Sequence, residues 1–186
     1  MKTSFKLIIT ALSALLSLGA LNAQPAGKGN GNAGKGGGSK SLTPEARQLV
    51  LEALAGPEGE YAAHALYSAV LAKFGNVQPY AAIREAEMRH IRALKNQLAK
   101  YGVPVPADPY AGKTASPATL MAAAQGGVDA EIKNVAMFDR FLVVVKNYPD
   151  LTQVFTNLRR ASKDAHLPAF KTALTTGGYT RSASQR

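Results

Sequence analysis

The chain has 186 residues, no cysteine, and 22 lysines and arginines against 12 acidic residues, which gives a net charge of +10. The lack of cysteine excludes disulfide bonds and thiolate metal sites. Residues 42–174 hold all 12 acids against 15 basic residues, a net charge of only +3. Because this segment also lacks a basic stripe with interleaved aromatic residues, we expect no nucleic-acid partner.

Residues 1–23 are predicted to be a signal peptide. Lys2 and Lys6 form a basic leader, residues 7–21 form an apolar run, and Ala23 offers a small residue for cleavage. The run of about 15 residues is shorter than the ~20 residues that a membrane-spanning helix needs. We therefore expect export to the periplasm or the medium and no membrane span; the alternative is a buried N-terminal helix.

Residues 24–41 are rich in glycine, lysine and asparagine. A segment of this composition has little apolar surface to bury, so it is predicted to be a flexible linker. Its lysines make it a basic arm, suited to weak contact with anionic polymers of the cell envelope.

Residues 42–175 are predicted to fold as an all-α helical bundle. Prolines fall where helices would start and glycines where they would end. The expected helices cover residues 44–55, 57–75, 79–101, 127–147 and 149–175. The proline-rich residues 101–116 are predicted to form a crossover loop between the second and third long helices. We expect a short helical turn at 117–125 and a flexible tail at 176–186.

Three glutamates fall in the middle of apolar helix faces when residues are placed 100° apart: Glu60, Glu87 and Glu131. The chain has only three histidines: His64 and His90 lie on or beside the faces of Glu60 and Glu87, and His166 lies on the apolar face of the fourth long helix. A carboxylate in an apolar core is costly unless it is paired, protonated or bound to a metal. Glu87 and His90 also form an E-x-x-H pair, which places both donors on one helix face.

These six residues are therefore predicted metal ligands, with His64 as a substitute for a missing ligand. Carboxylate oxygen and imidazole nitrogen suit iron, manganese or zinc. The alternative is an internal ion pair, for which Arg159 lies on the same face as His166. Ser162 and His166 also share a face, but a serine hydrolase would need a third orienting group and an oxyanion site.

Three stretches of the sequence carry a family resemblance: EGEYAAHALYSAVLAKFG, IREAEMRHIRALKNQLAKYGVPVP and FTNLRRASKDAHLPAF. Over residues 57–175 the chain resembles the ferritin-like superfamily, and in it a family of secreted bacterial domains of uncharacterised function. The resemblance implies a four-helix bundle with one crossover, single glutamates at Glu60 and Glu131, the pair Glu87–His90, and His166 as the last histidine. It also implies iron binding at a mononuclear or dinuclear site.

The sequence departs from this pattern at Lys163, which stands where a fourth carboxylate would complete a second E-x-x-H pair with His166. Pro168, inside the fourth long helix, is expected to bend it. Two hypotheses follow. The first is an exported metal-binding bundle, with a role in storage or as a dimetal-carboxylate oxidase, as a monomer or a homo-oligomer. The second is a metal-free envelope interaction module, in which Lys163 or another base satisfies the buried carboxylates.

Overall fold

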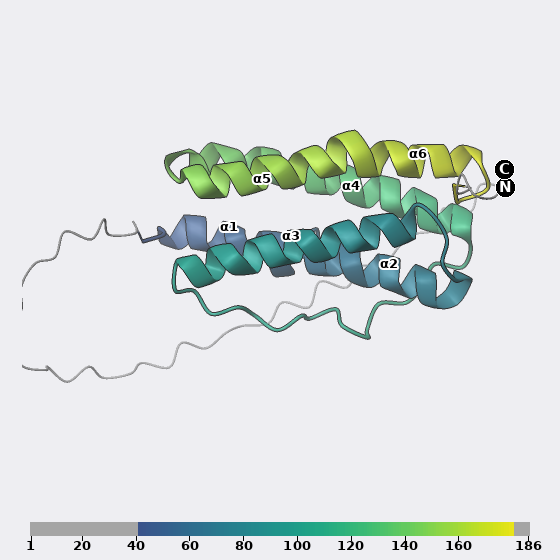
Figure 1. Ribbon diagram of the computed structural model, residues 1–186, viewed down its shortest axis with the longest axis horizontal. Helices are drawn as coiled ribbons and strands as arrows, with labels where there is room; N and C mark the ends of the chain where they lie inside the picture. The colour runs from purple at the N-terminus through teal and green to yellow at the C-terminus, as the bar shows by residue number, and fades with distance from the viewer. Residues whose placement is uncertain (1–40, 181–186) are drawn as a thin grey trace, which may run out of the picture. The chain divides into compact units, whose positions relative to one another are not determined.

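The computed structural model describes residues 41–180 (Figure 1). The predicted signal peptide, nearly all of the predicted linker and residues 181–186 of the predicted tail lie outside the described residues. Between residues 41 and 180 the regular structure is helical, without a β-strand, so the all-α prediction is confirmed. None of the helices in this part of the chain is long and apolar enough to cross a membrane.

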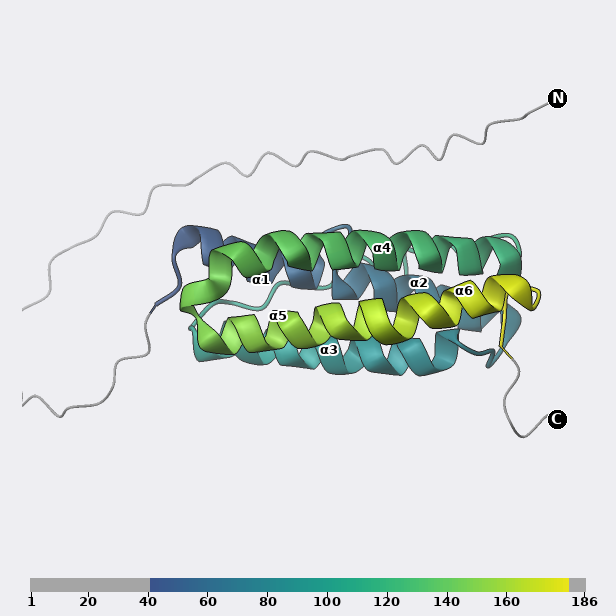
Figure 2. The same ribbon diagram turned by 90° about the horizontal axis from the view of Figure 1, so that it is seen from above.

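The helical elements, in chain order, are α1 (Pro44–Ala55), α2 (Glu60–Phe74), α3 (Tyr80–Lys100), α4 (Leu120–Val144), the short 3-10 helix η1 (Val145–Asn147), α5 (Pro149–Ala161), the π-helical segment η2 (Ser162–His166) and α6 (Leu167–Thr175). They form a four-helix bundle. One long side is α1 followed by α2, another is α5, η2 and α6 in line, and α3 and α4 are the other two (Figure 2). Residues 101–119 cross between α3 and α4, which confirms the predicted crossover.

The third long helix begins at Leu120, so the predicted break before residue 127 is wrong. The Thr119 side chain caps the helix by accepting a hydrogen bond from the N–H of Ala122 at 3.1 Å. The helix then continues through Gly126 and Gly127. A Cβ atom at Gly127 would lie 2.7 Å from the Phe170 ring, so this glycine serves close packing of α4 against α6 and does not mark a helix end.

The fourth long helix contains one wider turn that the sequence does not reveal. At η2 the N–H of Leu167 donates to the carbonyl of Ser162, five residues earlier, in place of the α-helical four. Pro168 follows directly, in the first turn of α6, where a missing N–H is tolerated. The π turn thus lies one helical turn before the proline.

The core consists of two apolar clusters with a polar layer between them. One cluster includes Leu94, Phe138 and Phe155, and the other includes Tyr67 and Phe170. The polar layer comprises the buried polar side chains of the described residues: Glu60, Glu87, Glu131, Asn134, Ser162 and His166. On each side of the bundle these residues fall between members of the two apolar clusters.

Residues 176–180, which the sequence analysis places in the tail, pack against the bundle. The Tyr80 hydroxyl donates to the carbonyl of Gly178 at 2.7 Å, and the N–H of Thr180 donates to the carbonyl of Gln78 at 2.8 Å. Gly178 has a φ of +93° and touches the backbone at Leu120, where a Cβ atom would not fit. These contacts join the chain end to the beginnings of α3 and α4.

Candidate metal centre

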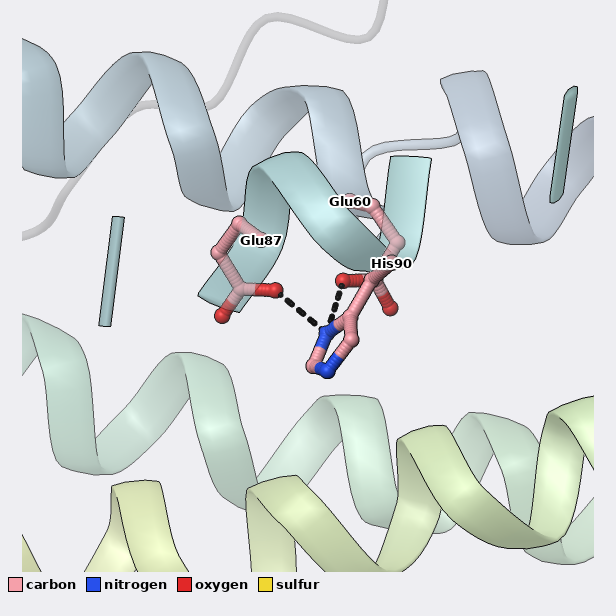
Figure 3. Close-up of side chains that lie close together, drawn as sticks. All are labelled: Glu60, Glu87 and His90. Atoms are coloured by element: carbon pink, nitrogen blue, oxygen red, sulfur yellow. Dashed lines mark hydrogen bonds and ion pairs between the residues drawn. The ribbon is translucent and has the colours of Figure 1, made fainter. Parts of the chain in front are cut away.

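The first group of donors comes from α2 and α3 and consists of two glutamates of the polar layer and a less buried histidine (Figure 3). We call Glu60, Glu87 and His90 the first trio. The Nδ1 atom of His90 lies 3.1 Å from Oε2 of Glu60 and 2.9 Å from Oε2 of Glu87. Both carboxylates are buried, whereas the His90 side chain is 13% exposed and is the most accessible member of the trio.

The second group adds residues from the other half of the chain, and we call Glu87, Glu131 and His166 the second trio. The Nδ1 atom of His166 lies 3.2 Å from Oε1 of Glu87 and 3.5 Å from Oε2 of Glu131. The rings of His90 and His166 are stacked, with centroids 5.7 Å apart. All three members of the second trio are buried.

Glu87 belongs to both trios and directs one carboxylate oxygen toward each histidine. In each trio the donor atoms lie within 4.8 Å of one another, which is close enough for one ion to contact all of them. The geometry thus offers two neighbouring three-ligand positions with one shared carboxylate.

Three further polar side chains hold the glutamates in place, and the sequence analysis did not assign them to the site. The Tyr67 hydroxyl donates to Oε1 of Glu131 at 2.7 Å. The Asn134 amide donates to the Glu58 carbonyl at 3.1 Å and lies 3.4 Å from Oε1 of Glu60. Ser162 in turn donates to Oδ1 of Asn134 at 2.9 Å. The available signal for Asn134 was its place three residues after Glu131, on the same helix face.

The π-helical segment decides which residue accompanies His166. In a regular α-helix, Lys163 would share a face with His166, because residues three apart are neighbours. The additional residue in the turn at η2 instead turns Lys163 to the surface, while Ser162 stays buried on the His166 side. Lys163 therefore does not satisfy a buried carboxylate, contrary to the alternative considered from the sequence.

Two other residues considered from the sequence lie elsewhere. Arg159 forms a surface ion pair with Asp139, so it does not neutralise the polar layer. His64 is half-buried in a cavity of about 440 Å³ between α2 and the crossover loop, with Asp108 and Tyr110, and belongs to neither trio. Burial and the nearby Arg84 charge lower the pKa of His64.

The carboxylates keep the two central histidines charged. Burial disfavours the charged form of each imidazole, but the adjacent carboxylates outweigh it. Glu60 and Glu87 raise the pKa of His90 to about 10, and Glu131 and Glu87 raise the pKa of His166 to about 9.

The pKa values of Glu60 and Glu87 shift in opposite directions. Burial and the charge of Glu87 raise the pKa of Glu60 to about 8. Burial alone would raise the pKa of Glu87 as well, but the neighbouring Glu60, His166 and His90 side chains lower it. At neutral pH the metal-free cluster therefore holds two imidazolium groups on either side of the Glu87 carboxylate, while the raised pKa of Glu60 favours its protonated form.

One atom in this cluster favours occupation by a metal. Nδ1 of His166 is buried and has no hydrogen-bond partner in the structure, although two carboxylate oxygens lie 3.2 and 3.5 Å away. A buried polar atom that makes no hydrogen bond is uncommon in folded proteins and calls for an explanation. After His166 releases its proton, an ion held by Glu87, Glu131 and His166 would bind this nitrogen, and nitrogen with carboxylate oxygen is a donor set that iron accepts.

No protein-family model and no curated protein sequence matches the chain. Several solved structures match the chain, and two of them illustrate its fold. The hypothetical protein MJ0754 from Methanococcus jannaschii has a TM-score of 0.66 at 21% identity, covering 78% of this chain and 88% of its own. The Desulfovibrio desulfuricans bacterioferritin, solved with its diiron site in different catalytic states, has a TM-score of 0.53 at 17% identity, covering 72% and 84%.

This chain has the ferritin-like fold. The likeness to bacterioferritin, together with the four long helices and the crossover, confirms the predicted ferritin-like four-helix bundle. At these identities the comparisons establish the fold, and the chemistry must be argued from the residues of the polar layer.

Proposed function

We propose that the chain is an exported iron-binding protein whose two-ion centre is formed by Glu60, Glu87, His90, Glu131 and His166. The observation that carries this proposal is the position of Glu87, whose two carboxylate oxygens face different histidines. The first trio would hold one ion, the second trio would hold the other, and Glu87 would contribute to both.

The protons of the metal-free cluster are exchanged for the ions. Metal ligands must be deprotonated, so loading requires His90, His166 and Glu60 to release their protons. Two divalent ions then face three carboxylates, which leaves one positive charge to be met by hydroxide or a small anion. Burial makes this compensation necessary, because an unpaired charge in the core is costly.

Iron is favoured over manganese and zinc because the solved structure with a similar fold and a named metal is a diiron bacterioferritin. All three metals accept carboxylate and imidazole ligands. Bound iron supplies electron-transfer chemistry with dioxygen, as an oxidase or a store would require. The protein would contribute the ligands, the hydrogen bonds that orient them and a buried, largely water-free environment.

An aerobic ferrous titration followed by absorbance, with metal analysis of the product, tests this proposal. We expect two iron ions per chain and an iron-to-carboxylate absorption band on exposure to air. A stoichiometry that stops at two indicates an oxidase, and tens of ions per chain indicate a store. The exposed Glu85→Gln variant, on the same helix as Glu87, is the matched control and should load like the wild type. No binding of iron, manganese or zinc would refute the proposal.

A metal-free interaction module is the second candidate, and the charge balance of the cluster favours it. Two imidazolium groups facing two carboxylates leave little net charge for an ion to neutralise. Under this proposal the unloaded domain binds anionic envelope polymers through its basic arm, and added metal changes neither stability nor binding. Metal content of the protein isolated from its native compartment separates the two candidates.

Export is a proposal that depends on residues 1–23, whose order of basic, apolar and small residues is typical of a signal peptide. N-terminal sequencing of the mature protein tests it. A start near Gln24 in the periplasm or the medium is expected, and full-length protein confined to the cytoplasm would contradict it.

A further inference from the structure

The outward face of α4 carries an apolar stripe. Of the five large apolar side chains exposed in the described part of the chain, three lie on this helix: Met121 at 44%, Ile132 at 49% and Val143 at 70%. Neighbouring members are 11 residues apart in the sequence. Eleven residues make three full helical turns plus about 20° and rise about 16 Å along the helix axis, so the side chains point in nearly the same direction. The three side chains therefore form one line along the bundle.

We propose that this stripe binds a second copy of the same chain, with the two α4 helices antiparallel about a two-fold axis at Ile132. Met121 and Val143 are equally distant from Ile132, in opposite directions. A second α4 placed antiparallel and centred on Ile132 would set Ile132 against Ile132, and Met121 of each copy against Val143 of the other. A stripe that matches its own reverse suits the self-complementary interface of a two-fold dimer.

The charges beside the stripe also match under this symmetry. Asp129 and Lys133 lie on the same flank of α4, at about 60° and 100° from Ile132. In the two-fold dimer, Asp129 of each copy would lie beside Lys133 of the other. Their positions would differ by only about 3 Å along the helix axis. Within residues 41–180 neither side chain has an ion-pair partner; Asp129 only accepts a hydrogen bond from Gln125. The dimer would thus form two reciprocal ion pairs.

The one acidic residue on the stripe itself, Asp139, does not oppose this arrangement. Its charge is paired with Arg159 of the same chain. Asp139 lies seven residues after Ile132 and Gln125 seven residues before it, so the two face each other across the proposed interface. An amide opposite a carboxylate is a favourable neighbour.

Sedimentation of the mature chain over a wide concentration range tests the proposal. We expect a monomer–dimer equilibrium whose dissociation constant rises about 100-fold in Ile132→Asp, since a central apolar contact is replaced by two facing charges. Val105→Asp, on the crossover loop with similar exposure (43%), is the matched control and should leave the dimer intact. Circular dichroism and the melting temperature of the Ile132→Asp monomer show whether it is folded.

Cross-linking tests the two-fold axis without depending on that variant. Because the chain has no cysteine, a single introduced thiol reports one position. Ile132→Cys should form a disulfide-linked dimer under mild oxidation, and Val105→Cys should not. Met121→Cys and Val143→Cys should link to each other when mixed but not when oxidised separately.

Charge exchange tests the flanking pairs. Asp129→Lys should weaken the dimer about tenfold, and Asp129→Lys combined with Lys133→Asp should restore it, because the pairs are re-formed with reversed sign. A monomer at all concentrations would overturn the proposal, as would a dimer that Ile132→Asp does not weaken and Ile132→Cys does not link.

Discussion

Oε2 of Glu87 lies 2.9 Å from Nδ1 of His90, three residues further along α3. Oε1 of the same carboxylate lies 3.2 Å from Nδ1 of His166 on the opposite side. Without metal, Glu87 is the partner of two charged imidazoles, and in the proposed metal-loaded state it would be the ligand shared by two ions. A change at this position should therefore alter both states of the protein.

Glu87→Gln is expected to destabilise the metal-free protein by up to roughly 3–5 kcal/mol, because it removes the carboxylate that faces both buried histidinium charges. The loss is limited by the ability of the histidines to release their protons. Added iron should raise the melting temperature of the wild type strongly and that of the variant little, since a ligand stabilises the folded state only as far as it binds. Thermal unfolding of both proteins, with chelator and with metal, measures the difference.

Glu85→Gln is the control for this comparison, because Glu85 is exposed and pairs only with Arg84 at the surface. Its effect should stay within about 1 kcal/mol in both states. An equal metal-induced increase in melting temperature for Glu87→Gln and the wild type would contradict the shared-ligand assignment.

The stability of the metal-free protein should fall as pH rises from about 5 to 10. Glu60 has a folded pKa of about 8 against 4.5, His166 about 9 against 6.5, and His90 about 10 against 6.5. Each group binds its proton more tightly when folded. Its stabilising contribution is therefore complete below the lower value and lost as pH rises through the higher one.

The metal-loaded protein should show the opposite trend, because protons compete with the ions for the same ligands. The gain in stability on adding metal should therefore increase with pH. Urea unfolding at several pH values between about 5 and 9, with and without metal, tests both signs. A metal effect that is independent of pH would argue against binding at His90 and His166.

Lys163→Glu and Ser162→Asp should behave differently, although only the first completes an E-x-x-H sequence. Lys163 is exposed, so a glutamate there should leave metal binding and stability nearly unchanged. Ser162 is buried beside Asn134, so an aspartate there should destabilise the metal-free protein and tighten metal binding by adding a carboxylate. Metal-binding isotherms and unfolding curves of the two variants measure this, and tighter binding in Lys163→Glu would refute the π-helical placement.

Gly126→Ala and Gly127→Ala should shift stability in opposite directions. A Cβ atom at Gly126 meets no other atom within 4 Å, so alanine should stabilise α4 by up to about 1 kcal/mol. At Gly127 the same methyl group would lie 2.7 Å from the Phe170 ring, and overpacking of this kind costs roughly 1–3 kcal/mol. Denaturant unfolding of the two variants compares them directly; equal effects would contradict the close packing of α4 on α6.

The sequence predicted the positions of the buried glutamates because helical periodicity fixes the direction of a side chain to within a fraction of a turn. Glu87 is the clearest case, with Ile83 and Ile91 marking the same face. The crossover followed from a run of prolines that fits no regular element. These features depend on local rules, and the structure reproduces them.

The features that were missed depend on contacts between distant segments. Lys163 is exposed because η2 has an extra residue in its turn, and periodicity at 100° per residue cannot anticipate that change. The helix was predicted to begin at Gly127, because the Phe170 ring that requires a glycine there belongs to a helix 43 residues later in the sequence. From the sequence Tyr67 is indistinguishable from other core aromatic residues, because its role depends on the hydrogen bond to Glu131 on another helix.

The crossover loop divides the bundle into two helical hairpins, and the two trios differ in which hairpins supply their residues. All members of the first trio come from α2 and α3, before the loop, whereas the second trio joins Glu87 to Glu131 and His166 from beyond it. The first binding position can therefore form within one hairpin, from residues at most 30 apart in sequence. The second exists only when the hairpins have docked. Occupancy of the second position would therefore report completed assembly, and a chain cleaved within residues 101–119 would need both fragments to regain it.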